Sequence, residues 1–398
     1  MKFKMFAATV HGKKYFERNL PCQDSSDVLK FDGVQIVAVA DGHGGKDYFR
    51  SDTGAKLAVS IAFEQIKIFC NELSAEERFS ESGIKNFELR LWDKWREAVK
   101  KDWDEQLANM TAEPRWQSVS DKYKARFTSD EKYIPVAYGT TLICAVSIGS
   151  QVLIFQIGDG SCVVLQRNGE FKIPVPPDAE NFANVTSSLC DEDAYKKFRH
   201  VVLDCAEDSP LAPVAIFLST DGLDDCWPIF ENEKHLYKFY GEVILDNIIS
   251  NSFASTEKEV REELLPYMTE HGSNDDISLA YLVTKDLNLL GRTLGKEISD
   301  PIKMKEPLSV MKSNLEKLKL NHEKMKKVVE DTQPQVKQQA EQAREKLLPA
   351  WWEERRIKHD GQSWNLQRGS LIREEQSAGS LFKSSEKLLP STGDDDFL

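Results

Sequence analysis

Short apolar runs alternate with turn residues along the first three quarters of the chain. The runs are rich in Val, Ile, Leu and Phe and are bounded by Gly, Asp and Ser, which is typical of β-strands. Most of them are apolar on both faces, so we expect both faces of each sheet to be covered. The predicted strands are 2–10, 34–40, 140–148, 151–157, 162–167, 214–220 and 277–283. The turn sequences SIGSQ and QRNGE further predict a meander through residues 140–173.

Longer segments repeat their apolar residues at helical spacing. Residues 52–70 and 85–109 each have one apolar stripe opposite charged residues, and a third helix is predicted near 256–268. Residues 111–137 are interpreted as a packed connection, with a substrate-side flap as the alternative. Strand-rich sheets covered by helices predict a layered sandwich of the α+β class.

The sequence changes character after about residue 285. Residues 313–347 are charged and favour a helix, but Pro334 interrupts their heptad pattern, so a long coiled coil is not expected. Residues 366–398 are rich in Ser, Gly, Lys and Asp, a composition typical of flexible segments. We therefore predict one folded domain over residues 1–290 and an extension over residues 291–398.

The chain of 398 residues has a formal charge of −13, which argues against a nucleic-acid or anionic-membrane partner. Its seven cysteines show no CxxC spacing, and several lie in apolar runs, so we interpret them as reduced. The N-terminus lacks the apolar core of a signal peptide, and no stretch has the roughly 20 apolar residues of a membrane helix. A cytoplasmic location is expected.

Aspartates stand at the ends of several predicted strands. An isolated Asp at such a place is normally a turn residue, and Asp32, which precedes Gly33 between two apolar runs, fits that description. A series of aspartates on strand ends is different, because sheet packing can bring the ends together. The series consists of Asp24, Asp41, Asp159, Asp221 and Asp275.

Gathered aspartates repel one another, and their pKa values rise unless cations neutralise them. Carboxylate oxygens favour Mg²⁺ or Mn²⁺ over Zn²⁺. Asp41 is followed by Gly42, and a glycine next to a ligand lets its backbone carbonyl approach a metal. Two such ions can share a water, lower its pKa and direct it at phosphorus. The aspartates therefore indicate metal-assisted hydrolysis of a phosphate ester.

The segments PCQD, VAVADGHGG, YGTTLICAV, IGDG, FLSTDGLDD and GSNDDIS resemble, in order and approximate spacing, the PPM family. This family comprises the metal-dependent, type 2C protein serine/threonine phosphatases. The resemblance covers about residues 5–285, and PCQD together with ENFANVTSSL is similar to the bacterial branch. It implies a four-layer α-β-β-α sandwich of two antiparallel sheets flanked by helices. Residues 1–290 would be the phosphatase domain, followed by a helical and partly flexible C-terminal extension.

The resemblance also implies roles for individual residues. Asp41 would bridge two Mn²⁺ or Mg²⁺ ions, Asp24 would hold a metal-bound water, and His43 would be the general acid to the departing seryl or threonyl oxygen. A third, weaker metal is implied at Asp159, Asp221 and Asp225. The full set of implied metal ligands is Asp24, Asp41, Gly42, Asp159, Asp221, Asp225 and Asp275.

Two departures from the family pattern affect the site. The arginine that binds substrate phosphate in many members stands five residues before Asp24, and here that position is Asn19. Asp276 occupies a position where the family usually has Asn, and we expect it to face water rather than strengthen metal binding. The basic residues that are candidates to bind phosphate instead, with no choice among them, are Lys13, Lys14 and Arg18.

These observations favour a protein serine/threonine phosphatase that hydrolyses phosphoserine and phosphothreonine by direct attack of an activated water. The alternative is a catalytically weak or inactive phosphatase-like module that acts as a phosphoprotein-binding or kinase-binding adaptor. The presence of all the central metal ligands favours the enzyme. The expected partner is a phosphoprotein substrate, with a cognate Ser/Thr kinase or its target at the extension as a further candidate.

Overall fold

A computed structural model describes residues 2–72, 74–178, 186–227 and 232–295, together with two short strands near the C-terminus. The chain divides into two units, Met1–Leu320 and Asn321–Leu398. In the second unit, β11 (Trp364–Gln367) pairs with β12 (Ser370–Arg373) in an antiparallel manner. The segment 313–347 and the residues after 373 lie outside the described residues, and the domain boundary at residue 290 stays a prediction.

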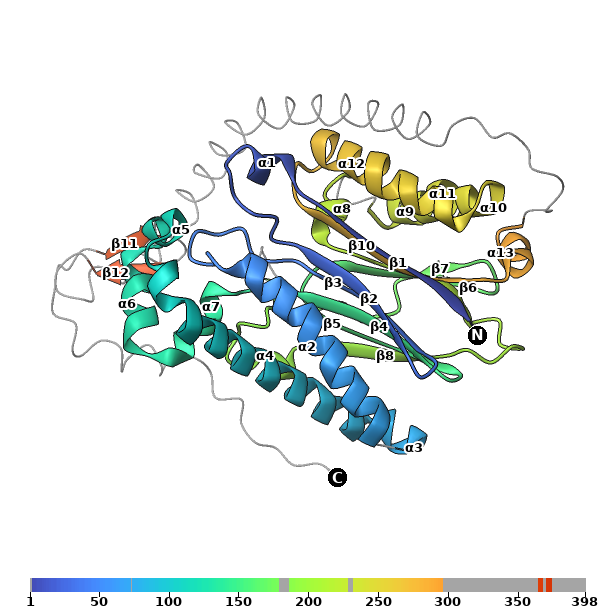
Figure 1. Ribbon diagram of the computed structural model, residues 1–398, viewed down its shortest axis with the longest axis horizontal. Coiled ribbons are helices and arrows are strands. Elements are labelled where there is room, and N and C mark those ends of the chain that lie inside the picture. The colour runs from blue at the N-terminus through green and yellow to red at the C-terminus, as the bar shows by residue number, and fades with distance from the viewer. Residues whose placement is uncertain are drawn as a thin grey trace, which may run out of the picture. The chain divides into compact units, whose positions relative to one another are not determined.

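The described strands of the first unit form two five-stranded antiparallel sheets (Figure 1). The first sheet has the order β1-β10-β9-β6-β7, with strands Phe3–Val10, Ile277–Thr284, Pro213–Ser219, Ser161–Gln166 and Phe171–Lys172. The second sheet has the order β2-β3-β4-β5-β8, with strands Ser25–Phe31, Val34–Ala40, Leu142–Ile148, Gln151–Ile157 and Arg199–Asp204. The sheets pack face to face, as predicted for an α-β-β-α sandwich.

Strand alternation divides the apolar side chains between two cores. In β3, Val37 and Val39 point into the core between the sheets, whereas Ile36 and Ala38 pack under helices on the outer face. All four side chains are fully buried. The strand is apolar on both faces because both faces are covered, which confirms the prediction made for such runs.

Helices cover the outer face of each sheet (Figure 1). The long helices α2 (Ser51–Glu72) and α4 (Glu81–Met110) pack on the second sheet through their apolar stripes. The first sheet is covered by helical segments that include α9 (Asn232–Lys238), α10 (Asp246–Ser250), α11 (Phe253–Glu259) and α12 (Leu265–His271). The remaining short helices are α1 (Lys13–Phe16), α3 (Ala75–Arg78), α5 (Pro114–Ser118), α6 (Asp121–Ser129), α7 (Ile134–Ala137), α8 (Asp221–Asp224) and α13 (Leu287–Thr293).

The predicted meander through residues 140–173 is wrong at its centre. The chain forms the β4–β5 hairpin in the second sheet and then crosses at Gly158–Gly160 to the first sheet, where β6 pairs with β9. Gly158 has a φ of 105°, a conformation that only glycine adopts readily. The crossing matters for function because it carries Asp159 between the sheets.

The sequence analysis missed β2 and β8, and it included β7 only as the end of the predicted meander. These strands contain partly exposed and charged positions, and each lies at the edge of a sheet, so their apolar pattern is weak. Residues 111–137 form α5, α6 and α7, and Phe127 of α6 is buried against Trp103 of α4. This segment is therefore packed on the domain, as interpreted. Among the described helices, none combines the length and apolar content needed to cross a bilayer.

Candidate metal and phosphate site

Strand register brings the first two aspartates together in the second sheet. Ser25, the first residue of β2, pairs with Ala40, the last residue of β3. Asp24 and Asp41 are the next residues outward on these neighbouring strands, so they lie side by side at one end of the sandwich. The loop that begins at Asp41 then continues toward α2.

Strand register in the first sheet brings three further aspartates to the same end. Ser219 of β9 pairs with Ser161 of β6 on one side and with Leu279 of β10 on the other. The residues just beyond these pairs lie at the shared end of three neighbouring strands. They include Asp159, Asp221 and Asp275.

The carboxyl groups of Asp41 and Asp221 meet between the two sheets and are in hydrogen-bond contact. Burial, followed by the charge of Asp221, raises the pKa of Asp41 well above its usual range. Burial is also the largest cause that raises the pKa of Asp221 to about 6. Two carboxylates this close do not both stay ionised without added positive charge. The pair is therefore the centre of the acidic site.

Asp24 lies near this pair and is buried, with a relative exposure of 4%. The hydroxyl of Thr220 donates a hydrogen bond to its Oδ2 at 2.7 Å. Burial, and then the charge of Asp276, raises the pKa of Asp24 well above its usual range. Because its carboxylate is tied to Thr220, Asp24 belongs to the support of the site.

The other predicted acidic residues lie around the pair. Asp159 accepts a hydrogen bond from Thr186, and its charge acts on both Asp41 and Asp221. Asp275 is half-buried and is bound by the ammonium group of Lys14. Asp225 is exposed at the rim.

The residues that follow Asp41 are packed too tightly for any side chain at position 42. A Cβ on Gly42 would lie 2.6 Å from the carbonyl oxygen of Gln23 and 2.7 Å from that of Ser51. The amide of Gly42 donates to the same Gln23 oxygen at 3.2 Å. Glycine is therefore required at position 42 by the close approach of two backbone segments.

The YGTT segment holds the Asp41 loop in place. Thr141 donates its amide to the Asp41 carbonyl at 2.8 Å, and its hydroxyl accepts from the Asp41 amide at 3.0 Å. The hydroxyl of Thr140 donates to the same Asp41 carbonyl at 2.8 Å. These bonds fix the backbone at the point where the metal-binding residue was predicted. The segment was noticed in the sequence, but no role was assigned to either threonine.

His43 lies on this loop beside Tyr48. The two rings are 4.9 Å apart in an edge-to-face arrangement, and the amide of His43 donates to the carbonyl of Gly139 at 3.0 Å. A Cβ on Gly139 would lie 2.6 Å from His43 Cδ2, so the imidazole is supported by backbone. Burial lowers the pKa of His43. The ring is therefore held rigidly next to the acidic residues.

The three basic candidates differ in their surroundings. The ammonium of Lys14 is 2.7 Å from Asp275 Oδ2, whereas Lys13 pairs with exposed Glu270 at 3.8 Å. Arg18 is exposed. Asn19, at the position of the usual arginine, has a φ of 54°, a left-handed conformation that Asn tolerates better than most residues. Among the three candidates, Lys14 is the one in contact with the acidic site.

The expectation that Asp276 faces water is wrong. Its relative exposure is 3%, and its carboxylate accepts hydrogen bonds from the backbone amides of Gly12 and Gln23. The neighbouring Tyr15 was also missed in the sequence. It is buried, and its pKa is raised by burial and then by Asp275. A buried tyrosine among polar residues gives no signal in the sequence pattern.

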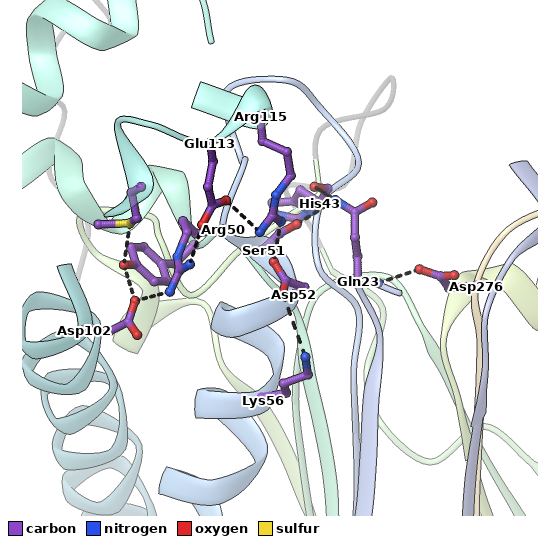
Figure 2. Close-up of polar contacts among 12 residues, drawn as sticks. Gln23, His43, Arg50, Ser51, Asp52, Lys56, Asp102, Glu113, Arg115 and Asp276 are labelled. Atoms are coloured by element: carbon purple, nitrogen blue, oxygen red, sulfur yellow. Dashed lines mark hydrogen bonds and ion pairs between the residues drawn. The ribbon is translucent and has the colours of Figure 1, made fainter. Parts of the chain in front are cut away.

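A second polar network anchors the helices behind the His43 loop (Figure 2). Asp102 of α4 accepts hydrogen bonds from the guanidinium of Arg50 at 2.6 Å and from the hydroxyl of Tyr138 at 2.5 Å. Arg115 of α5 donates to Asp52 at 2.7 Å. The residues come from segments far apart in the sequence, so no local motif predicted the network.

The donor chemistry of the site suits a hard divalent cation. The carboxylates at its centre would supply oxygen ligands. The ammonium of Lys14 is paired with Asp275, so one of these carboxylates already stabilises a positive charge. Within the described ranges, however, no group of three or more His, Cys, Asp and Glu side chains is gathered closely enough to surround one ion. The residues fit metal binding by their type and by the Asp41–Asp221 contact.

Comparisons with known proteins identify the family of the chain. Residues 11–264 match the family described as protein phosphatase 2C. Over 204 residues the chain is 25% identical to serine/threonine-protein phosphatase 3 of Escherichia coli (strain K12). That match covers 50% of this chain and 66% of the relative, just under two thirds of its length.

Solved structures with a similar arrangement include two phosphatases. Serine/threonine phosphatase Stp1 from Staphylococcus aureus is 13% identical, with a TM-score of 0.45 over 72% of this chain and 96% of that chain. The catalytic domain of serine threonine protein phosphatase PstP, in complex with 2 manganese ions, is 13% identical, with a TM-score of 0.43 over 71% of this chain and 99% of that chain. Since the family match extends over more than half of the sequence, the chain belongs to the protein phosphatase 2C family.

Proposed function

We propose that this protein is a metal-dependent protein phosphatase that hydrolyses phosphoserine and phosphothreonine. The observation that carries the proposal is the contact between the half-buried carboxyl groups of Asp41 and Asp221, with His43 on the same loop. Membership of the protein phosphatase 2C family supports the same reaction. Such a carboxyl pair is unfavourable without positive charge, which gives it a clear use in binding cations.

Asp41, Asp221 and Asp275 would hold a pair of Mn²⁺ or Mg²⁺ ions, with the Gly42 carbonyl as a further ligand. Asp159 and Asp225 would add a weaker third site. Bound ions of this kind lower the pKa of a coordinated water and stabilise negative charge on the phosphate oxygens. The remaining ligand, Asp24, would orient water from its place on Thr220.

The protein's own residues would complete the reaction. His43 would donate a proton to the seryl or threonyl oxygen as the phosphorus–oxygen bond breaks. Burial lowers the pKa of this imidazole, and the negative charge of a bound phosphate would favour its protonated form. Lys14 is our candidate to bind the substrate phosphate, because it already contacts the acidic site.

A phosphopeptide assay of the full chain tests the proposal. Phosphate release from phosphoserine and phosphothreonine peptides should require Mn²⁺ or Mg²⁺ and should stop when a chelator is added. Asp221→Asn should lower the rate by at least about 100-fold. Release that persists in chelator would contradict metal dependence, while metal binding without any turnover would favour the adaptor function. The cytoplasmic location and a kinase-binding role for residues 291–398 stay predictions.

A further inference from the structure

Asp276 is a buried carboxylate whose two oxygens both bind backbone amides. The amide of Gly12 donates to Oδ1 at 2.6 Å, and the amide of Gln23 donates to Oδ2 at 2.7 Å. Both distances lie at the short end of the range for N–H···O hydrogen bonds. One side chain at the start of β10 thereby clamps two separate points of the N-terminal segment.

Gln23 transmits this clamp to the loop that carries His43 (Figure 2). Its side-chain amide donates to the hydroxyl of Ser51 at 2.8 Å and to the carbonyl of His43 at 3.2 Å. Its backbone carbonyl accepts from the amide of Gly42 at 3.2 Å. A single residue therefore connects the Asp276 carboxylate with the first residues of α2 and with the Asp41 loop.

Close backbone packing keeps the clamp rigid. A Cβ on Gly12 would lie 2.4 Å from the carbonyl carbon of Asp275, and one on Gly222 would lie 1.9 Å from the carbonyl oxygen of Asp276. The backbone around Asp276 is therefore in direct contact with both neighbouring segments. Neither contact leaves room for a side chain, so these segments pack backbone against backbone.

We propose that Asp276 is a positioning residue for the candidate active site. Through Gln23 it sets the place of Gly42 and His43 relative to Asp275, its neighbour in the chain. Both of its oxygens accept from amides, so its carboxylate is engaged by the protein rather than directed at a ligand. The catalytic part of this inference rests on the proposed function, whereas the clamp itself does not.

Asp276→Asn is the sharpest test even though Asn is the residue usual in the family, because in this chain both contacts of the side chain are amide donors. An asparagine offers one acceptor oxygen and would turn its NH₂ toward the second donor. Glu17→Gln is the matched control: it removes one negative charge from an exposed position in the same segment. We expect Asp276→Asn to lower kcat on a chromogenic aryl phosphate at least about 10-fold with KM changed less than about 2-fold. The control should match the wild type.

Two further readouts separate positioning from a general loss of structure. Calorimetry with Mn²⁺ should show about 10-fold weaker binding to Asp276→Asn than to Glu17→Gln. Hydrogen exchange on the full chain should show faster exchange around residues 12 and 23 in Asp276→Asn, with the core strands unchanged. Unaltered kcat and Mn²⁺ affinity in a folded Asp276→Asn variant would overturn the proposal.

The wild-type chain provides a test that needs no variant. If Asp276→Asn fails to fold, amide hydrogen exchange in the wild type still tests whether Asp276 binds the two amides. The amides of Gly12 and Gln23 should then be protected from exchange as strongly as those of β10. Exchange at the rate of exposed amides would overturn the clamp. A wild type that lacks phosphatase activity but protects both amides would instead contradict the proposed function and leave the clamp standing.

Discussion

Asp41 and Asp221 are in hydrogen-bond contact although they follow strands of different sheets. Each lies just beyond the end of a fully buried strand, β3 or β9, so the core holds the backbone that leads to each residue. The fold thus holds two like charges together. The energetic cost of this contact is what makes the pair responsive to protons and to cations.

The first prediction concerns the stability of the metal-free protein. The pKa of Asp221 rises from 3.8 to about 6 on folding, so between these values the folded state keeps a proton that the unfolded chain has released. This contribution is complete below about pH 4 and is lost as the pH rises through about 6. We expect the melting temperature, relative to that of Asp221→Asn, to fall by about 5 °C between pH 5 and pH 8.

Thermal melts in chelator measure this difference directly, and added Mn²⁺ should remove it in the wild type. A difference between wild type and Asp221→Asn that stays flat, or rises with pH, would show that folding does not raise the pKa of Asp221.

The second prediction concerns His43 as the general acid. His43→Gln should slow hydrolysis of a phosphoserine peptide by about 100-fold but that of a chromogenic aryl phosphate by less than about 10-fold, because an aryl oxide leaves without a proton. Steady-state rates on both substrates test this. Equal losses on the two would assign His43 to support of the loop instead.

The third prediction concerns the support of the imidazole by Gly139. In Gly139→Ala the new methyl group would lie 2.6 Å from both His43 Cδ2 and Tyr48 Cδ1, so one ring must move. We expect kcat on a phosphopeptide to fall about 10-fold. Gly241→Ala is the control, since its Cβ would make ordinary contact with Phe171 at 3.4 Å. Unchanged kcat in Gly139→Ala would mean that the ring position is unimportant.

The fourth prediction concerns the anchor between α2 and α4. Asp102→Asn weakens the bonds from Arg50 and Tyr138, and we expect it to lower the free energy of unfolding by about 1–3 kcal/mol. The control on the same helix is Asp104→Asn, whose pair with Lys100 is exposed and should contribute little to stability. Urea denaturation compares the two, and equal effects would contradict a special role for Asp102.

The sequence predicted the strands that are buried on both faces and the positions of the aspartates at their ends. Those features follow from local composition, because a run such as VQIVAVA is apolar whichever sheet it joins. It did not predict that β5 and β6 belong to different sheets, since a tight turn and a crossing both use glycine. Sheet membership depends on long-range pairing, which no short segment specifies.

Asp276 illustrates the same limit within the site. An aspartate beside a predicted ligand was expected to face water. Its carboxylate is instead buried and accepts hydrogen bonds from two backbone amides near the other end of the chain. Nothing near position 276 in the sequence indicates those donors. Likewise, the sequence alone did not favour Lys14 over Lys13 and Arg18 as the phosphate-binding candidate, because the contact between Lys14 and Asp275 depends on the fold.

The most direct test of the central claim is phosphate release from a phosphothreonine peptide as a function of Mn²⁺ concentration, for the full wild-type chain and for Asp41→Asn. We predict saturable activation by Mn²⁺ in the wild type and at least about 100-fold less turnover in Asp41→Asn at every concentration. The same Mn²⁺ dependence and rate in both proteins would contradict a metal-dependent phosphatase centred on Asp41 and Asp221.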